Sequence, residues 1–389
     1  MNILIVNYEF PPVGGGGGRA VYKLARQWAR TDSVDYVTLR AGDLKSRENV
    51  DGIRLHRVSS LGREDLNAAP IRSLLWYPVS GLLRGMELLS RQRYDVINSH
   101  FAVPSGLLGT FLSAICGIPH VASIHGIDIY DPSRWISPHV CFPVGMVVRW
   151  VLHRANRVIA QSTDTAQNAQ KYYGKDLARK MEIVPLAFDP KEPEKLAGGS
   201  SAKLEEMGLS SDSVCLIGVG RLVKRKGFAN LIRSLPELPD QVQLLIVGNG
   251  PQKEELVRIR TSLGLEKRVV LADHLTDRDK YRFLRAADIF VLPSEHEGFG
   301  IVLQEAMSVG LPIVATSHGG QTDLLEDGLN AILIDSSEPK CIAEGIMRLI
   351  ENRQLRRRMS KANLQHIRDF NPPTIASRYI NIFRENVKI

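Results

Sequence analysis

The sequence predicts an α/β protein with two domains, each built on a doubly wound, mostly parallel β-sheet. The chain has 389 residues, which is too many for one ordinary core and suits two domains of roughly 180 residues. Short apolar segments alternate with helical stretches along both halves, which is typical of parallel strands joined by helices. A polar stretch containing proline and glycine, Asp189–Lys203, separates the halves and is the best linker candidate.

The first predicted domain spans residues 1–190. Its expected strands are MNILIVNY, VDYVTL, IRLHRV, YDVINSH, PHVASIHG and ANRVIAQS. Helices are expected between them, over VYKLARQWAR, Arg72–Arg93, GLLGTFLSAICG and TAQNAQKYYG. Because the strands are apolar along their length, we expect both faces of the sheet to be buried.

The second predicted domain spans residues 191–372 and repeats this order. Its expected strands are VCLIGVG, QVQLLIVGNG, RVVLAD, ADIFVLP, LPIVAT and NAILID. Its expected helices are FANLIRSLPEL, PQKEELVRIRTSLG, DRDKYRFLRAA, GIVLQEAMSVG and PKCIAEGIMRLIENR. Whether the C-terminal helix, about residues 373–389, packs back on the first domain is not decided by the sequence. Both folds are Rossmann-like, and ligands bind such sheets beyond the strand C-termini, so the cleft between the domains is the expected site.

Composition places the protein among soluble globular proteins, with 44% hydrophobic and 24% charged residues. No apolar run reaches about 18 residues, so we expect no transmembrane helix. The start, MNILIVNYEF, predicts a first strand rather than a signal peptide. The four cysteines are scattered, which indicates free buried thiols in the cytoplasm rather than a zinc site or disulfides.

The net charge of +8 lies mostly in the first domain, where 22 lysines and arginines face 16 aspartates and glutamates. Two segments there mix apolar, aromatic and basic residues: Arg72–Arg93 and Arg134–Arg154. Our first interpretation is helices that cover the sheet, and the alternative is a surface that rests on anionic lipid. No basic-aromatic motif for nucleic acid is present.

A glycine run, Gly14–Gly18, follows the first strand and precedes Arg19 and a helix. Five glycines allow close approach of a ligand to the backbone at a helix N-terminus. The run also fits GxGxxG loosely, but the second strand ends at Arg40 rather than at an acid, which argues against NAD and more weakly against NADP. A flexible turn is the structural alternative.

Two more residues follow a strand, His125 and Asp128 in the segment IHGID. A histidine there can bond a sugar hydroxyl or steady a developing charge. The alternative is a buried histidine satisfied by backbone groups. His100 ends the preceding strand and ranks below His125.

The loop GRLVKRKG, Gly220–Gly227, places Arg221 and Lys226 after an apolar strand, so both can face one ligand. Its glycine boundaries favour a phosphate cradle. We expect the neighbouring Lys224 and Arg225 to be solvated, as most charge runs are.

The segment EGFGIVLQE sets Glu297 and Glu305 on either side of a helix start. The alternative is that the two carboxylates face the same direction only by coincidence. However, a carboxylate inside an apolar helix, as at Glu305, usually has a binding partner or a functional role. A nucleotide-activated sugar requires cations that bind its diphosphate and carboxylates that bind its hydroxyl groups. The turn SHGGQTD offers further N–H donors, and we interpret Asp277-Arg278-Asp279 as a helix cap rather than a metal-binding DxD motif.

Together, the glycine run, HGID, GRLVKRKG and the Glu297–Glu305 motif resemble those of family-4 glycosyltransferases with the GT-B fold, over nearly the whole chain. The resemblance implies retaining transfer of a sugar from a nucleotide donor, without a metal or another cofactor. The catalytic residues it implies are His125, Glu297, Arg221 and Lys226.

The resemblance also implies the binding residues. The donor-binding residues would be Gly15, Gly16, Gly17, Arg221, Lys226, Glu297, Gly298, Phe299, Gly300 and Glu305. Of these, Arg221 and Lys226 would hold the diphosphate, and Glu305 the ribose. The acceptor side would comprise Gly14, Arg19, His125 and Asp128.

Two departures from the family pattern leave the nucleobase open: Leu186-Ala187-Phe188-Asp189 at the domain junction and Asp273 where glycine is common. We favour a UDP-sugar over a GDP-sugar, and as acceptor a glycan or lipid-linked glycan at the inner membrane face. Three alternatives remain at this point: a nucleotide-sugar epimerase of the same fold, an NADP-dependent oxidoreductase, and a non-catalytic sensor of nucleotide sugars.

Overall fold

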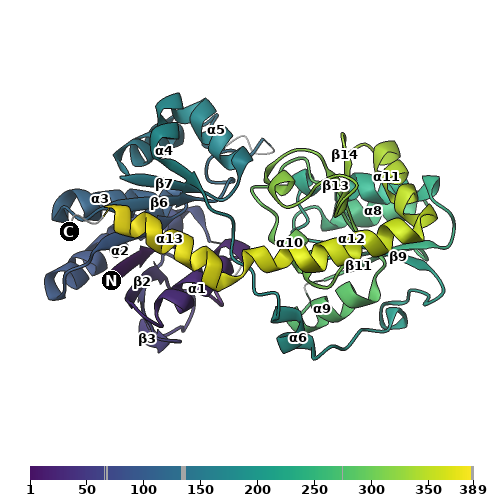
Figure 1. Cartoon of the computed structure of the whole chain (residues 1–389), viewed down its shortest axis with the longest axis horizontal. Coiled ribbons are helices and arrows are strands. Elements are labelled where there is room, and N and C mark those ends of the chain that lie inside the picture. Colours follow the sequence, from purple (N-terminus) through teal and green to yellow (C-terminus); the bar gives the residue numbers. More distant parts are fainter. Residues whose placement is uncertain (65, 67–68, 133–136, 274, 387–389) are drawn as a thin grey trace. The chain divides into compact units, whose positions relative to one another are not determined.

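Figure 1 shows the computed structural model, which describes residues 1–64, 66, 69–132, 137–273 and 275–386. The chain divides into two compact units, Met1–Phe188 with Phe370–Ile389, and Asp189–Asp369. Each unit contains a largely parallel sheet flanked by helices, which confirms the predicted fold class.

The sheet of the first unit has eight described strands in the order β3-β4-β2-β1-β5-β6-β7-β8. Their bounds are β1 Asn2–Val6, β2 Ser33–Leu39, β3 Arg47–Val50, β4 Ile53–Val58, β5 Val96–His100, β6 His120–Ile124, β7 Arg157–Ala160 and β8 Met181–Ile183. Only the β3–β4 pair among them is antiparallel. Strand β3 was not predicted, because RENV is a polar, half-exposed edge strand without an apolar run.

Alternate residues of β1 face two different hydrophobic cores, as the pleat of a strand requires. Ile3 and Ile5 pack with α1 (Gly16–Trp28) and α13 (Pro372–Asn386). Leu4 and Val6 pack with α2 (Ile71–Arg91) and α3 (Leu107–Cys116) on the other face. The helices α4 Phe142–Arg154 and α5 Thr163–Tyr173 cover the strands β6 and β7.

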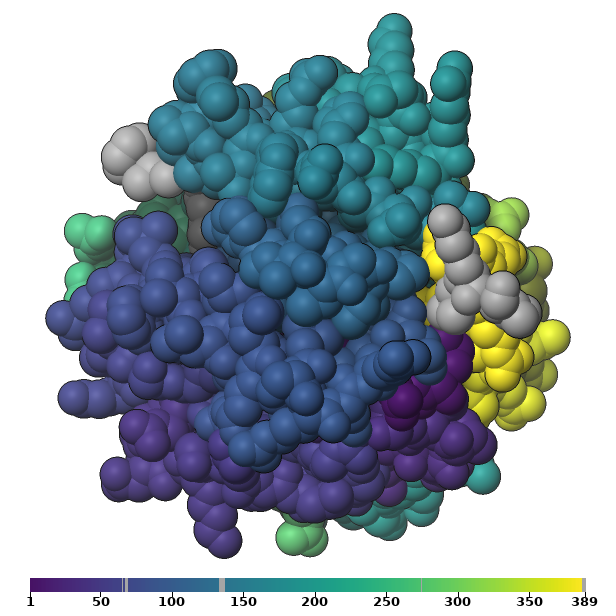
Figure 2. Space-filling view, turned by 90° about the vertical axis from the view of Figure 1, so that its left-hand side faces the viewer, coloured from purple at the N-terminus to yellow at the C-terminus, as the bar shows by residue number. Residues whose placement is uncertain are grey.

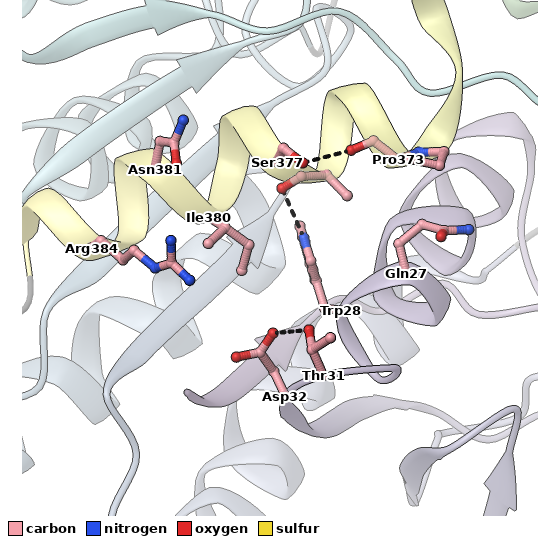
Figure 3. Close-up of a pocket in the computed structure, with 10 residues that line it drawn as sticks. Gln27, Trp28, Thr31, Asp32, Pro373, Ser377, Ile380, Asn381 and Arg384 are labelled. Atoms are coloured by element: carbon pink, nitrogen blue, oxygen red, sulfur yellow. Dashed lines mark hydrogen bonds between the residues drawn. The ribbon is translucent and has the colours of Figure 1, made fainter.

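The C-terminal helix α13 belongs to the first unit and packs against α1. Figure 3 shows the Trp28 indole pointing to the backbone of α13, where Nε1 donates to Ala376 O at 3.1 Å. The rings of Tyr379 and Phe383 lie 5.6 and 5.4 Å from that of Trp28, between centroids. A second buried hydrogen bond runs from Gln161 Nε2 to the hydroxyl of Tyr379 at 3.0 Å. Aromatic packing and these two hydrogen bonds therefore hold the helix against the first unit.

The sheet of the second unit has six described strands, all parallel, in the order β11-β10-β9-β12-β13-β14. The strands are β9 Val214–Val219, β10 Val242–Val247, β11 Val269–Ala272, β12 Ile289–Leu292, β13 Ile313–Thr316 and β14 Ala331–Ile334. The helices are α6 Glu192–Ala197, α7 Phe228–Ser234, α8 Lys253–Ser262, α9 Asp277–Ala286, α10 Ile301–Ser308, α11 Pro339–Glu351 and α12 Arg353–His366.

Three expectations need correction. The boundary between the two units lies at the start of the linker candidate Asp189–Lys203. This stretch is more than a linker, however, because Glu192–Ala197 forms α6 and packs on α9, where Arg285 Nη2 donates to Glu194 Oε2 at 3.2 Å. In the segment Arg134–Arg154 only Phe142–Arg154 is helical, and residues 133–136 lie outside the described part. All four cysteines are free, but only Cys215 is buried.

Candidate active site

In the second unit, the loops after β9 and β12 are bound to each other. Gly227 has φ +70°, and a Cβ there would lie 2.1 Å from Pro293 O, so only glycine permits this approach. Glu295 N donates to Arg225 O at 2.7 Å, and Arg225 Nη1 donates to His296 O at 3.0 Å. The loop GRLVKRKG and the loop preceding EGFG thus form one surface.

A buried ion pair joins Lys226 to Glu297 on this surface. Ser294 Oγ also donates to Glu297 Oε1, at 2.8 Å, and Arg225 Nη1 lies 3.9 Å from Oε2. Burial alone would raise the pKa of Glu297, but the charges of Lys226 and Arg225 outweigh it and lower that pKa. Burial lowers the pKa of Lys226, and the carboxylate of Glu297 opposes that shift. The pair joins two residues that lie 71 positions apart in the sequence.

Among the other basic residues of the loop, Arg225 differs from expectation. Arg225 is not solvated, because it is held against the EGFG loop as described above, and no local pattern indicates this long-range contact. Lys224 is exposed, as expected, and Arg221 is exposed at the C-terminal end of β9. Arg221 thus lies in the same loop as Lys226 but is not part of the buried cluster.

The backbone of Gly298, Phe299 and Gly300 leads directly into α10. Gly300 has φ +102° and precedes the first helical residue. Gly320 N donates to Glu297 O at 2.7 Å, and a Cβ on Gly319 would lie 3.1 Å from Glu297 N and O. The glycines of SHGGQTD therefore support the EGFG turn from the next strand.

The second carboxylate, Glu305, lies on α10 and has a partner that the motif EGFGIVLQE does not indicate. Lys280 Nζ donates to Glu305 Oε1 at 2.6 Å and to Asp277 Oδ1 at 3.1 Å. The capping interpretation of Asp277-Arg278-Asp279 needs one refinement. The residue that caps α9 is Thr276, whose Oγ1 accepts from Asp279 N at 3.1 Å.

In the first unit, His125 is buried beyond the end of β6. Its Nε2 lies 3.2 Å from His100 Nδ1, and its ring stacks on Phe101 with centroids 4.2 Å apart. Phe101 has φ +70°, which is strained for a phenylalanine. Burial lowers the pKa of His125 to about 3, so the imidazole is neutral near pH 7.

Asp128 organises the backbone around His125. Its Oδ1 accepts from His125 N at 2.8 Å and its Oδ2 from Ala102 N at 2.7 Å. Burial raises the pKa of Asp128 to about 6, although these hydrogen bonds oppose the shift. In this structure Asp128 is a loop-building carboxylate rather than an exposed one.

The glycine run holds a carboxylate of its own chain. Glu9 Oε2 accepts from Gly15 N and from Gly18 N, each at 3.2 Å. A Cβ on Gly14 would lie 2.6 Å from Glu9, and one on Gly17 would lie 2.7 Å from Phe101 Cζ. Close packing on Glu9 and Phe101 thus explains these glycines, while Gly15, Gly16 and Arg19 are exposed.

Two family descriptions match the chain, one on each half. "Glycosyltransferase Family 4" matches residues 14–192, and "Glycosyl transferases group 1" matches residues 201–366. The chain belongs to glycosyltransferase family 4. This glycosyltransferase therefore cannot be the oxidoreductase that the glycine run left open.

Curated relatives of this glycosyltransferase match nearly its whole length in one case and about two thirds of it in another. A D-inositol 3-phosphate glycosyltransferase of Xylanimonas cellulosilytica is 27% identical over 394 residues, covering 97% of this chain and 94% of the relative. The putative teichuronic acid biosynthesis glycosyltransferase TuaC of Bacillus subtilis is 29% identical over 257 residues, covering 65% and 61%.

Solved structures share the fold. HepE from Anabaena in complex with UDP superposes with a TM-score of 0.77 at 23% identity, covering 99% of this chain and 100% of HepE. Sucrose-phosphate synthase from Thermosynechococcus elongatus gives 0.84 at 22% identity, covering 98% of each chain. These neighbours confirm the GT-B fold of the glycosyltransferase.

Within the described residues, no group of three or more His, Cys, Asp or Glu side chains is arranged to hold a metal ion. The nearest sequence candidate, Asp277 and Asp279, is engaged with Lys280 and Arg282.

Proposed function

We propose that the protein transfers a sugar from a UDP-sugar to a glycan or lipid-linked glycan, with retention of anomeric configuration and without a metal ion. The observation that carries the proposal is the buried Lys226–Glu297 pair within the joined loops of the second unit. The ammonium of Lys226 is buried next to a carboxylate, Ser294 and Arg225. This arrangement suits the binding of a sugar nucleotide, whose leaving diphosphate needs positive charge beside it.

Positive charge would act where the diphosphate gains negative charge. Lys226 is buried, where an electrostatic contact is worth more than in water, and Arg221 is exposed nearby in sequence. Arg225 adds a third positive group close to Glu297. Three basic side chains in one loop support a metal-independent reaction, in which they replace the divalent cation.

The preference for UDP rests on the structural neighbours. HepE has been crystallised with UDP and with UDP-glucose. In the present chain, Asp273 follows β11 and pairs with Lys253, so this loop carries charged groups where the nucleobase would be read.

The acceptor has two candidate classes. The name of TuaC, a putative teichuronic acid biosynthesis glycosyltransferase, supports a glycan acceptor. The names of several relatives that are 26–27% identical support instead a small phosphorylated polyol, inositol 3-phosphate. We take the glycan as the first candidate acceptor, and the transfer assay below includes the polyol phosphate as the second.

For retention, we propose front-face substitution, in which the departing phosphate oxygen helps deprotonate the acceptor hydroxyl. Glu297 would then position the donor sugar rather than form a covalent bond. His125 would act as a neutral hydrogen-bonding group toward the transferred sugar, because burial lowers its pKa to about 3.

The test is a transfer assay with UDP-glucose, UDP-galactose and UDP-N-acetylglucosamine, each with an oligosaccharide acceptor or with inositol 3-phosphate, in the presence of EDTA. A product with the donor's anomeric configuration by NMR supports the proposal. Inversion, or strict dependence on added Mg²⁺ or Mn²⁺, contradicts it. An altered sugar or free nucleotide released without acceptor would favour an epimerase.

We further propose that the first unit contacts anionic membrane. The buried face of α2 consists largely of small or polar residues, including Ser73, Ser80, Gly81 and Gly85, whereas Leu75 and Leu83 are 74% and 72% exposed. An ordinary helix of a globular protein has the opposite arrangement. Figure 2 views this end of the unit, with residues of α2 and α3 in blue at the centre of the face.

The apolar surface continues from α2 to α4 and is framed by basic residues. Phe111 of α3 and Trp150 of α4 lie 5.4 Å apart between ring centroids, and Phe142 is 77% exposed. Exposed arginines on or beside these helices are Arg72, Arg91, Arg93, Arg149 and Arg154. This combination supports insertion of apolar side chains between anionic headgroups. No described helix is both long and apolar enough to cross a bilayer.

Co-sedimentation with vesicles tests the membrane contact. We expect binding to vesicles of anionic phosphatidylglycerol, weaker binding in high salt, and loss of binding in L75E/L83E. The control L263E/L329E changes two exposed leucines of the second unit and should bind normally. Equal binding of both double variants, or none by the unmodified protein at low salt, would refute the contact.

A further inference from the structure

Lys280 lies beside the carboxylate assigned to the donor ribose, on the neighbouring helix. It occupies the first turn of α9, and its Nζ donates to Glu305 Oε1 at 2.6 Å. Both side chains are only 11% exposed. The same Nζ donates to Asp277 Oδ1 at 3.1 Å, so one ammonium group joins two carboxylates from two helices.

The hydrogen bond from Lys280 uses one oxygen of Glu305. Within the described residues, Oε2 accepts no hydrogen bond, and it belongs to a carboxylate whose residue is 8% exposed. Oε2 does not belong to the fully buried side-chain atoms that lack a partner, so it is accessible from solvent and can accept from a ligand. The unfilled oxygen therefore suits a ligand hydroxyl.

We propose that Lys280 is a positioning residue for the donor nucleotide, which fixes Glu305 so that Oε2 accepts from the ribose hydroxyls. This inference rests on the proposed function, because it takes Glu305 as the ribose-binding group. Lys280 itself does not touch the reacting atoms; it acts through Glu305.

Charge supports this role. Burial alone would lower the pKa of Lys280, but Glu305 and Asp277 outweigh burial and raise it, so the ammonium stays charged over the physiological range. Without that charge, two carboxylates would remain near an incoming diphosphate, and Glu305 would be free to change rotamer. Both effects weaken nucleotide binding, but only the second depends on the ribose hydroxyls.

The alternative role is purely structural, in which Lys280 only ties α9 to α10. A structural tie and a positioning residue differ in one measurable quantity. Loss of a tie lowers affinity for every nucleotide equally. Loss of a positioning residue removes the preference for a ribose that has its hydroxyl groups.

The experiment measures Kd by calorimetry for UDP and for 2′,3′-dideoxy-UDP. For the unmodified protein we expect UDP to bind about 10- to 100-fold more tightly, the range for hydrogen bonds to a charged group. We expect this ratio to fall below about threefold in K280M, to recover in K280R, and to disappear in E305A. The matched control is K195M, which removes an exposed ion pair with Asp189 in the same unit.

The possible results distinguish failure of the inference about Lys280 from failure of the donor assignment on which it rests. A K280M variant that keeps the unmodified ratio overturns the inference, even if both affinities drop. An unmodified protein that does not distinguish the two nucleotides, or that binds neither, overturns the donor assignment itself. If K280M does not fold, K280M/D277N replaces it, since the second change removes the like charge that Lys280 neutralises.

Discussion

Replacing Lys226 with methionine separates the structural and the catalytic roles of the buried ion pair. The change leaves Glu297 buried beside Ser294 Oγ at 2.8 Å and Arg225 at 3.9 Å. Breaking a buried pair from one side costs about 3–5 kcal/mol, and we expect the lower end because those two partners remain. At about 2–4 °C per kcal/mol for a unit of this size, the melting temperature should fall by roughly 6–12 °C.

The double variant K226M/E297Q should recover most of that stability, because no buried charge is then left unpaired. Activity should not recover. We expect kcat/KM to fall about 10²–10³-fold in K226M, the scale of one lost charge-stabilising contact, and to stay low in the double variant.

Melting curves and donor-saturation kinetics of the unmodified protein, K226M, E297Q and the double variant complete this cycle. Near-normal turnover in K226M would refute the assigned role of Lys226. Recovery of both stability and activity in the double variant would show that the pair is only structural. K224M, which alters an exposed lysine of the same loop, is the control and should match the unmodified protein.

Four further predictions follow from individual contacts. G227A should weaken UDP binding more than tenfold by calorimetry, since its Cβ would lie 2.1 Å from Pro293 O; unchanged affinity would argue against the joined loops. W28F should lower the free energy of unfolding by about 1–2 kcal/mol in urea titrations, because the bond to Ala376 O is lost. Burial lowers the pKa of His125 to about 3, so it stays neutral above pH 6; H125Q should lower kcat/KM without changing its profile from pH 6 to 8. Treatment with EDTA should leave the rate within about twofold, whereas restoration by one added cation would indicate a metal.

The fold was predictable because both sheets are buried on both faces. Strands such as β1 and β9 are then continuous apolar runs that the sequence displays directly. The elements that were missed do not have this property. Strand β3 is a polar edge strand, and helix α6 lies in a stretch whose prolines and glycines suggested a linker.

The candidate site was predictable only as separate motifs. Each lies at the end of a strand, where parallel sheets place their ligands, but the pairing between motifs depends on tertiary contacts. Lys226 meets Glu297 across 71 residues, and Lys280 meets Glu305 across 25. Likewise, nothing local to the glycine run indicated that Glu9 fills its N–H groups.

The central claim is that the second unit binds a nucleoside diphosphate through Lys226 and Glu305 without a metal. Calorimetric titration of UDP, GDP and ADP in EDTA tests it most directly. We predict that UDP binds most tightly and that K226M and E305A each weaken its binding at least tenfold. Binding of no nucleotide, or UDP affinity unchanged in both variants, would contradict the account.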